Sequence, residues 1–212
     1  MERRMNEETD AIQKTLDELH ELTSHDMTNE TKFLGHVPIR TLNIGDRFDA
    51  DGHFFTVIDK SDCWVQVLSG DLTGLSVPFY SELYGSKYDV HTKYGSSSLR
   101  RYIEKIIQPE IEGTFGKDNI LENPKVYPYI MRPVTFIEWI SNDIIRMSDP
   151  YGYPWWTCSS GSRNMVMQCP TAIVINENGH AENISVERKA YVRVTFFLDS
   201  ETFVHRLDDP CM

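Results

Sequence analysis

The spacing of apolar residues changes along the chain, and each change predicts a different kind of element. Near the N-terminus, apolar residues recur at helical spacing: Met5, Ile12, Leu16, Leu19 and Leu22. Acidic side chains fill the opposite face. This pattern predicts an amphipathic helix over residues 6–22 with one narrow apolar stripe. The polar residues 23–32 that follow are typical of a linker.

From about residue 36 onward, the pattern becomes that of β-strands. Residues 54–58 and 64–68 are rich in β-branched and aromatic side chains, which favours strands. Residues 59–62 between them can close a hairpin. The dipeptide Asp51-Gly52 is a two-residue turn signal of the kind that joins antiparallel strands.

Two further helices are predicted in the middle of the chain. The first begins at a serine N-cap, and its apolar face consists of Leu99, Tyr102, Ile103 and Ile106. We expect Pro109 to end this helix, because proline cannot donate a helical hydrogen bond. The second begins at Thr135, which has capping-box spacing to Glu138. Its apolar positions are Ile137, Ile140 and Ile144.

The C-terminal third returns to strand patterns. The dipeptide Asn178-Gly179 is a strong hairpin signal. Apolar and polar residues then alternate in the order Val192, Arg193, Val194, Thr195 and Phe196. This alternation predicts a strand with one buried and one exposed face.

The order of these elements predicts the α+β class, with an antiparallel sheet whose first and last strands are far apart in sequence. We expect two parts. Residues 1–35 form an acidic helical arm and linker, and residues 36–212 form one α+β domain.

Composition adds a strong charge asymmetry. The 212 residues carry a net charge of −11, with 40% hydrophobic and 11% aromatic residues, so a real core is expected. An acidic chain repels phosphate, which disfavours direct nucleic-acid binding and favours a basic protein partner. Residues 1–35 hold nine acids and four bases. Glu18 and Glu21 on this arm are candidate partner contacts. The arm can dock on the domain, pair with a second copy as a homodimer, or meet a partner.

Neither a membrane segment nor a cofactor is expected. No apolar run approaches the ~20 residues that span a bilayer, and the N-terminus lacks an apolar signal core. No two of the four cysteines have metal-site spacing, so we expect free thiols in a reducing cytoplasm and no metal. The sequence has no metalloprotease, serine-hydrolase or phosphate-loop motif, which favours a non-enzymatic protein.

Four short stretches form a recognisable series: residues 45–48 with 52–58, residues 97–103 (SSLRRYI), residues 155–161 (WWTCSSG) and residues 191–196 (YVRVTF). Together they resemble domain of unknown function 6273, a family of bacterial and phage-encoded proteins. The resemblance covers roughly residues 40–200. The family is distantly similar to the C-type-lectin-like fold of formylglycine-generating enzymes and of phage receptor-binding proteins. This similarity implies a mixed domain with a small antiparallel sheet, two helices and irregular displayed loops. It implies no reaction.

The aromatic stretch DPYGYPWWTCSSGSRN, residues 149–164, is the main candidate for partner contact. Adjacent tryptophans on a strand point to opposite faces, so we expect one ring in the core and the other on a binding face. Tyrosine and tryptophan offer large contact areas with a polar handle. The candidate contacts here are Tyr151, Tyr153, Trp155, Trp156, Arg163 and Asn164.

Three functions stay open. The first is a non-enzymatic binding protein that recognises a macromolecular partner, most plainly a protein, in a bacterial host cell. The second is an acidic phage or mobile-element inhibitor of a defence nuclease, comparable to an anti-CRISPR protein, that occupies a cationic groove. The third is an oxidase of the formylglycine-generating type, in which Cys158 and Cys169 hold Cu(I).

Overall fold

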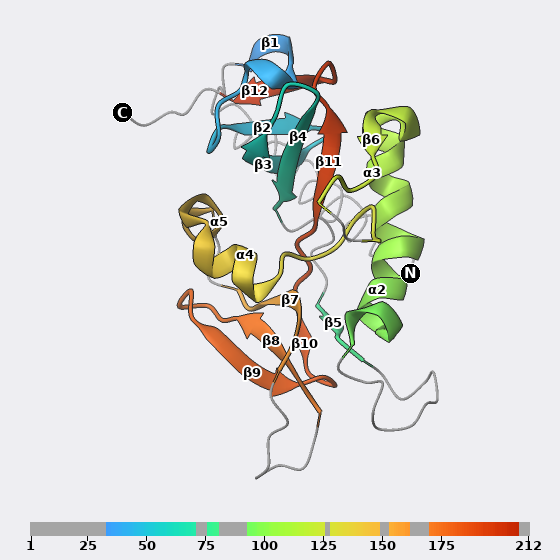
Figure 1. Ribbon diagram of the computed structural model, residues 1–212, viewed down its shortest axis with the longest axis vertical. Helices are drawn as coiled ribbons and strands as arrows, with labels where there is room; N and C mark the ends of the chain where they lie inside the picture. The colour runs from blue at the N-terminus through green and yellow to red at the C-terminus, as the bar shows by residue number, and fades with distance from the viewer. Residues whose placement is uncertain are drawn as a thin grey trace, which may run out of the picture. The chain divides into compact units, whose positions relative to one another are not determined.

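The fold is α+β, with three antiparallel sheets and a few short helices (Figure 1). The computed structural model describes residues 33–70, 76–80, 93–125, 128–148, 153–161 and 170–207. Residues 34–207 form one compact unit. The predicted helix over residues 6–22 lies outside the described residues.

The largest sheet combines strands from both ends of the unit. Its seven strands run in the order β1-β12-β2-β3-β4-β11-β6. They are β1 Phe33–Pro38, β2 Arg47–Ala50, β3 His53–Lys60, β4 Trp64–Ser69, β6 Ile120–Leu121, β11 Thr195–Asp199 and β12 Phe203–Leu207. Strand β1 crosses the predicted arm boundary at residue 36. It runs antiparallel to β12, since Ile39 donates to the Thr202 carbonyl and the His36 and His205 rings lie 3.5 Å apart.

The hairpins of this sheet follow the predicted turn signals. Asp51 and Gly52 have φ of 51° and 80°, and they join β2 to β3 where Ala50 pairs with His53. The positive φ at both positions explains the Asp-Gly dipeptide. The predicted β3–β4 hairpin is confirmed, with a loop of residues 61–63.

Two smaller sheets complete the unit. One joins β7 Trp155–Ser160, β8 Thr171–Ile175 and β9 Ala181–Ser185, and the other joins β5 Val77–Pro78 to β10 Lys189–Ala190. The predicted turn between β8 and β9 is confirmed, with φ of 70° at Gly179.

The first predicted helix is longer than expected. It consists of α2 Ser98–Tyr102, a π-helical turn Ile103–Ile107 and α3 Gln108–Phe115. Ser97 is the N-cap, as predicted, and its Oγ accepts a bond from the Arg100 amide at 3.0 Å. The prediction that Pro109 ends the helix is wrong. The π turn resets the hydrogen-bond register, so Pro109 lies in the first turn of α3, where its missing N–H costs nothing.

The same π turn changes which residues face the core. The buried side chains recur every four residues: Leu99, Ile103, Ile107, Ile111 and Phe115. A repeat of four drifts around an α-helix of 3.6 residues per turn, and the wider π turn absorbs this drift. Ile106, predicted to be on the apolar face, is instead 51% exposed.

The second predicted helix is divided into α4 Phe136–Ser141 and α5 Asp143–Met147. The capping box of Thr135 and Glu138 is confirmed. Asn142 interrupts the helix with φ −124° and ψ 108°, and its Oδ1 accepts bonds from the first amides of α5.

Two apolar clusters cover opposite faces of β7. Trp156 belongs to the larger cluster, with α2, α3 and one face of the large sheet. Trp155 belongs to the smaller cluster, with Trp139 and Ile145 from α4 and α5. Both rings are therefore buried, at 0% and 1% exposure. The ring expected on a binding face lies in the core because both sides of β7 are covered.

The second face of β11 is covered as well. Arg193 and Thr195 were expected on an exposed face, but they are only 5% and 2% exposed. Arg193 donates to the carbonyls of Ser69 and Ser148, and its guanidinium lies 5.1 Å from the centre of the Trp155 ring. The half-buried strand prediction is wrong here: β11 begins only at Thr195, and Trp155 and the end of α5 cover the side on which Arg193 lies.

Candidate functional site: an exposed apolar helix surface on a buried polar anchor

Helices α4 and α5 expose large apolar side chains. Ile137 and Ile140 on α4 are 68% and 52% exposed, and Met147 on α5 is 80% exposed. We call these three residues the α4–α5 surface. The core contacts of the two helices come instead from Trp139 and Ile145. Of the predicted isoleucine positions, Ile137 and Ile140 therefore point away from the core, whereas Ile144, in α5, is partly buried and packs against the smaller cluster.

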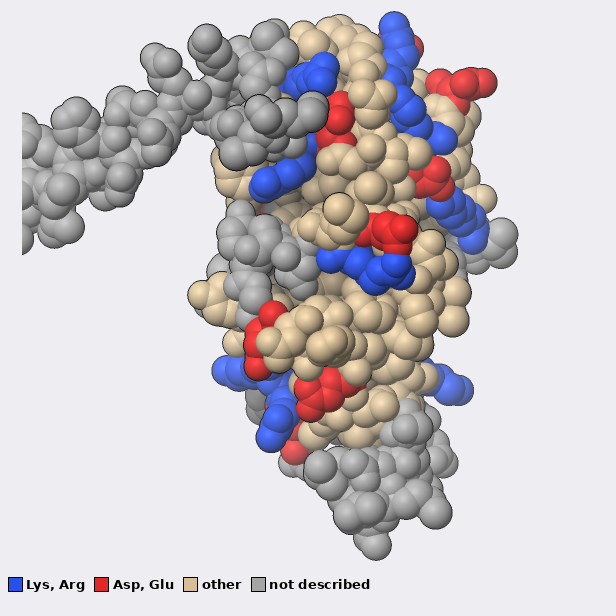
Figure 2. Space-filling view, turned by 90° about the vertical axis from the view of Figure 1, so that its left-hand side faces the viewer, with Lys and Arg blue, Asp and Glu red and all other residues tan. Residues whose placement is uncertain are grey.

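Tyr153 borders the same region. It is 56% exposed, and its ring lies 4.9 Å from that of Tyr191, which packs on the small cluster beneath α4 and α5. Tyr153 is thus a predicted contact residue that the structure places at the surface. Figure 2 views the side of the molecule on which α4 and α5 lie, and there charged groups are separated by broad uncharged areas.

A buried ion pair fastens α4 to the domain. Arg132 is 1% exposed, and it donates to both carboxylate oxygens of Glu138 at 2.6 and 2.7 Å. Glu138 also accepts the Thr135 amide at 2.7 Å, as the capping box requires. Burial by itself would raise the pKa of Glu138. The hydrogen bonds and the charge of Arg132 outweigh burial, so the pKa of Glu138 lies below its ordinary value.

A β-bulge on β7 completes this anchor. The β7–β8 register shifts between Trp156 and Ser160. Within the bulge, the Cys158 amide donates to the Val134 carbonyl at 3.0 Å, and Ser159 Oγ accepts the Phe136 amide at 2.9 Å. The bulge thus turns β7 toward the start of α4, a common role for this irregularity.

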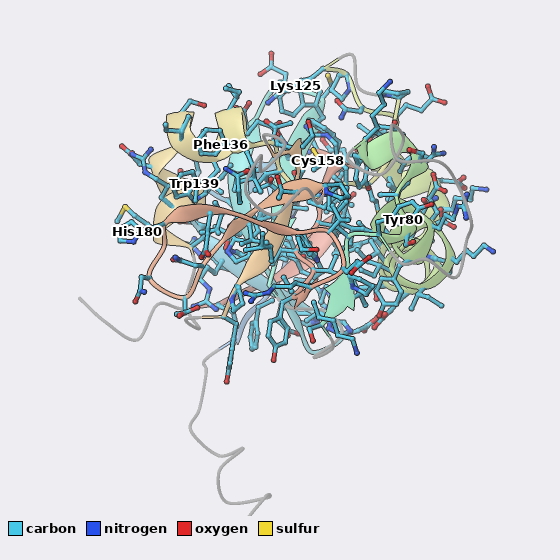
Figure 3. All side chains as sticks on the ribbon, turned by 90° about the horizontal axis from the view of Figure 1, so that it is seen from below. Tyr80, Lys125, Phe136, Trp139, Cys158 and His180 are labelled. Carbon is cyan, nitrogen blue, oxygen red and sulfur yellow. The ribbon has the colours of Figure 1, made fainter. Side chains whose placement is uncertain are left out.

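Cys158 lies beside the ion pair, between α4 and the α2–α3 helix in the view of Figure 3. Arg132 Nη1 is 3.9 Å from its sulfur. Burial raises the pKa of Cys158 to about 11. The charge of Arg132 lowers this pKa and that of Glu138 raises it, so the two act against each other. The thiol is therefore protonated at neutral pH, unlike the thiolate that nucleophiles and metal sites need.

A tyrosine hydroxyl is also buried in this cluster. Tyr94 is 7% exposed, and its hydroxyl has no hydrogen-bond partner among the described residues. Burial raises the pKa of Tyr94 well above its ordinary value, and interaction with Cys158 raises it further. The ring packs edge-on against Tyr129 at 5.1 Å. We name Tyr94, Arg132, Glu138 and Cys158 the polar anchor.

The sequence pattern had indicated this region only in part. Glu138 was visible as a capping residue, but no local signal pointed to Arg132 as its partner. The other predicted contacts lie outside the described residues: Tyr151, Arg163, Asn164, Glu18 and Glu21. Cys169 of the predicted thiol pair lies outside them too. In the described part of the chain, no three His, Cys, Asp or Glu side chains gather as a metal site would require.

The acidic charge is unevenly distributed. The described residues contain 15 of the 21 bases and 17 of the 32 acids, a net of −2. The remaining 6 bases and 15 acids give a net of −9, more than half of it in residues 1–35. The described domain is therefore close to neutral, and any strong electrostatic attraction must come from the other segments.

No family model, no curated protein and no solved structure matches this chain. Among the described residues, no helix combines the length and apolar composition that crossing a membrane requires.

Proposed function

We propose that this protein is a non-enzymatic binding protein that recognises a protein partner through the α4–α5 surface and Tyr153. The observation that carries the proposal is the exposure of Ile137, Ile140 and Met147 on two consecutive short helices. Apolar side chains gathered on one solvent-facing helix surface mark contact sites for other macromolecules.

The polar anchor supports this proposal because it fixes α4 without using the isoleucines. The bidentate Arg132–Glu138 pair and the Ser159 hydrogen bond hold the start of α4, while Trp139 fills the core. A helix held in this way presents its outer side chains with little further loss of conformational entropy on binding. Such preorganisation increases the affinity for a partner.

The family assignment remains part of the proposal. The antiparallel sheets and few helices are compatible with a C-type-lectin-like domain of the 6273 family. The family segments around Trp155 and Tyr191 are joined by a β-bridge, which is consistent with one scaffold. By this resemblance the protein is phage- or mobile-element-encoded and acts in the bacterial cytoplasm.

A more specific candidate function is inhibition of a nucleic-acid-binding defence nuclease. The observation that favours it is the net charge of −9 outside the described residues, because such segments can occupy a cationic groove. Deleting residues 1–30 should then abolish binding, and raising the salt concentration should weaken it steeply. Salt-insensitive binding by the truncated protein would leave the α4–α5 surface as the contact.

The decisive experiment compares two isoleucines of matched exposure. Ile140→Glu changes the α4–α5 surface, and Ile106→Glu changes an equally exposed isoleucine on the π turn, at 52% and 51% exposure. Pull-down from the native host with mass spectrometry should identify a partner that the wild type and Ile106→Glu retain and Ile140→Glu loses. Equal retention by both variants would contradict the proposal.

The oxidase alternative has its own test. Because burial raises the pKa of Cys158 to about 11, we expect slow alkylation by iodoacetamide at pH 8. Cys158→Ala and Cys169→Ala should leave partner binding intact. Fast alkylation, or copper binding that both substitutions abolish, would favour an enzyme.

A further inference from the structure

A lysine of this chain occupies a site built like a receptor for an ammonium group. Lys125 Nζ donates to Asp59 Oδ2 at 2.6 Å and to Gln66 Oε1 at 2.7 Å. The same nitrogen lies 5.4 Å from the centre of the Trp64 ring and 5.7 Å from that of Phe197. Two oxygen acceptors and two aromatic faces therefore surround one cation.

The walls of this site are positioned by the sheet and do not depend on Lys125. Asp59 on β3 pairs with Gln66 on β4, and Gln66 pairs with Phe197 on β11. The Trp64 and Phe197 rings are 5.2 Å apart and nearly perpendicular, at 82°. Neighbouring strands thus place Asp59, Gln66 and Phe197 in one row, and Trp64, two residues before Gln66 on β4, lies on the same face. We name Asp59, Trp64, Gln66 and Phe197 the ammonium site.

The amide of Gln66 is oriented for an acceptor role. Gln66 is 2% exposed, and its Nε2 donates to Thr195 Oγ1 at 2.9 Å. This bond directs the opposite atom of the amide, Oε1, toward the ammonium. The β3–β4 register shifts between Val57 and Asp59, so an irregularity of β3 directly precedes the Asp59 carboxylate. Such bulges re-aim side chains near functional positions.

Lys125 itself lies outside the regular elements, in the turn that follows β6. Its side chain is 38% exposed and that of Asp59 is 41% exposed. The ammonium group is thus reached from solvent, and another cation can enter without passage through the core. Departure of Lys125 would leave Asp59 without its cationic partner and the Trp64 and Phe197 faces without a cation, which favours a replacement cation.

We propose that the ammonium site is a receptor for an unmodified lysine side chain of a partner protein, with Lys125 as a built-in competitor. Both oxygens lie at hydrogen-bond distance, so they require N–H donors. A trimethylated lysine has none and cannot satisfy them. A tethered lysine has a high effective concentration, so the incoming lysine must displace it. The proposal does not depend on the α4–α5 surface.

The test uses the full chain and a small probe, Nα-acetyl-lysine methylamide. In Lys125→Ala, titration should shift the Trp64 indole N–H signal in ¹H–¹⁵N spectra, with an affinity at least about tenfold higher than in the wild type. The trimethyl-lysine analogue should bind about tenfold more weakly than lysine. Lys105→Ala, which changes an exposed helical lysine, should behave as the wild type.

Two further variants decide the outcome. Adding Asp59→Asn to Lys125→Ala removes the charged acceptor and keeps Trp64 as the reporter, so the probe should no longer shift the Trp64 indole signal. No probe binding by a folded Lys125→Ala protein, or equal binding of the trimethyl analogue, would overturn the proposal. If Lys125→Ala fails to fold, n-butylammonium should restore cooperative thermal unfolding, and the absence of rescue would also overturn it. None of these outcomes changes the interpretation of the Ile140→Glu experiment, because that experiment tests a different surface.

Discussion

The α2–α3 helix buries most of its isoleucines, whereas α4 exposes both of its own. In α2–α3, Ile103 and Ile107 are completely buried, and a π turn keeps them on the core side. In α4, Ile137 and Ile140 face solvent, and an ion pair with a capping box holds the helix. The α2–α3 helix is held by apolar packing. Helix α4 is held by polar bonds at its N-terminal end and by the buried ring of Trp139. A helix fixed by polar bonds keeps its apolar residues available for a partner.

The largest expected effect is at the packed helix. Ile103→Ala should lower the free energy of unfolding by about 2–5 kcal/mol, because it leaves a cavity in the main core. Chemical denaturation measures this change. Ile106→Ala, three residues along the same helix, is the matched control and should change stability by less than about 0.5 kcal/mol. A small effect at Ile103 would mean that α2–α3 is not held by packing.

The next effect is at the polar anchor. Glu138→Gln should destabilise the protein by about 1.5–3 kcal/mol, because Arg132 loses its charged partner while it stays buried. The folded pKa of Glu138 lies below its unfolded value. Its contribution is therefore complete above the unfolded carboxyl pKa and is lost as the pH falls through the folded pKa. Denaturation curves of both proteins should converge in acid, and a constant gap down to the lowest pH would contradict this account.

A third substitution should stabilise the protein. Tyr94→Phe removes a buried hydroxyl that no described residue hydrogen-bonds, so we expect a gain of about 1 kcal/mol. The melting temperature should rise. Tyr129→Phe changes the ring that packs against Tyr94 and provides the comparison. A loss of stability in Tyr94→Phe would show that the hydroxyl has a partner in solution.

The smallest effect on stability is expected at the exposed surface. Ile140→Ser should change the free energy of unfolding by less than about 0.5 kcal/mol, because the side chain makes little core contact. Thermal melts of the wild type and of Met147→Ser provide the comparison. A loss of several kcal/mol would place Ile140 in the core and end its role as a contact residue.

Local patterns predicted local structure well. The Asp51-Gly52 turn, the Ser97 N-cap and the Thr135–Glu138 capping box depend only on residues a few positions apart, and all three are confirmed. The apolar repeat of four residues was present in the sequence, and it is the signal that predicts a π turn. An ordinary helical period assigns Ile106 to the core, and the missing N–H of Pro109 predicts the end of the helix there, but the π turn overrides both predictions.

Long-range packing could not be derived in the same way. Both Trp155 and Trp156 are buried because one cluster covers each face of β7, and those clusters join segments far apart in sequence. The Arg132–Glu138 pair and the Lys125 contacts likewise depend on tertiary placement. Charge patterning indicated an acidic protein, but the residues that the structure describes carry a net charge of only −2.

Strand order has a consequence for how this chain folds during synthesis. Strands β2, β3 and β4 can form hairpins as soon as they leave the ribosome, because their partners are adjacent in sequence. The outer edges of β2 and β4 must wait for β12 and β11, which are translated more than 120 residues later. Until then, the nascent sheet exposes two unpaired edges, the state in which chaperones and aggregation compete for a chain.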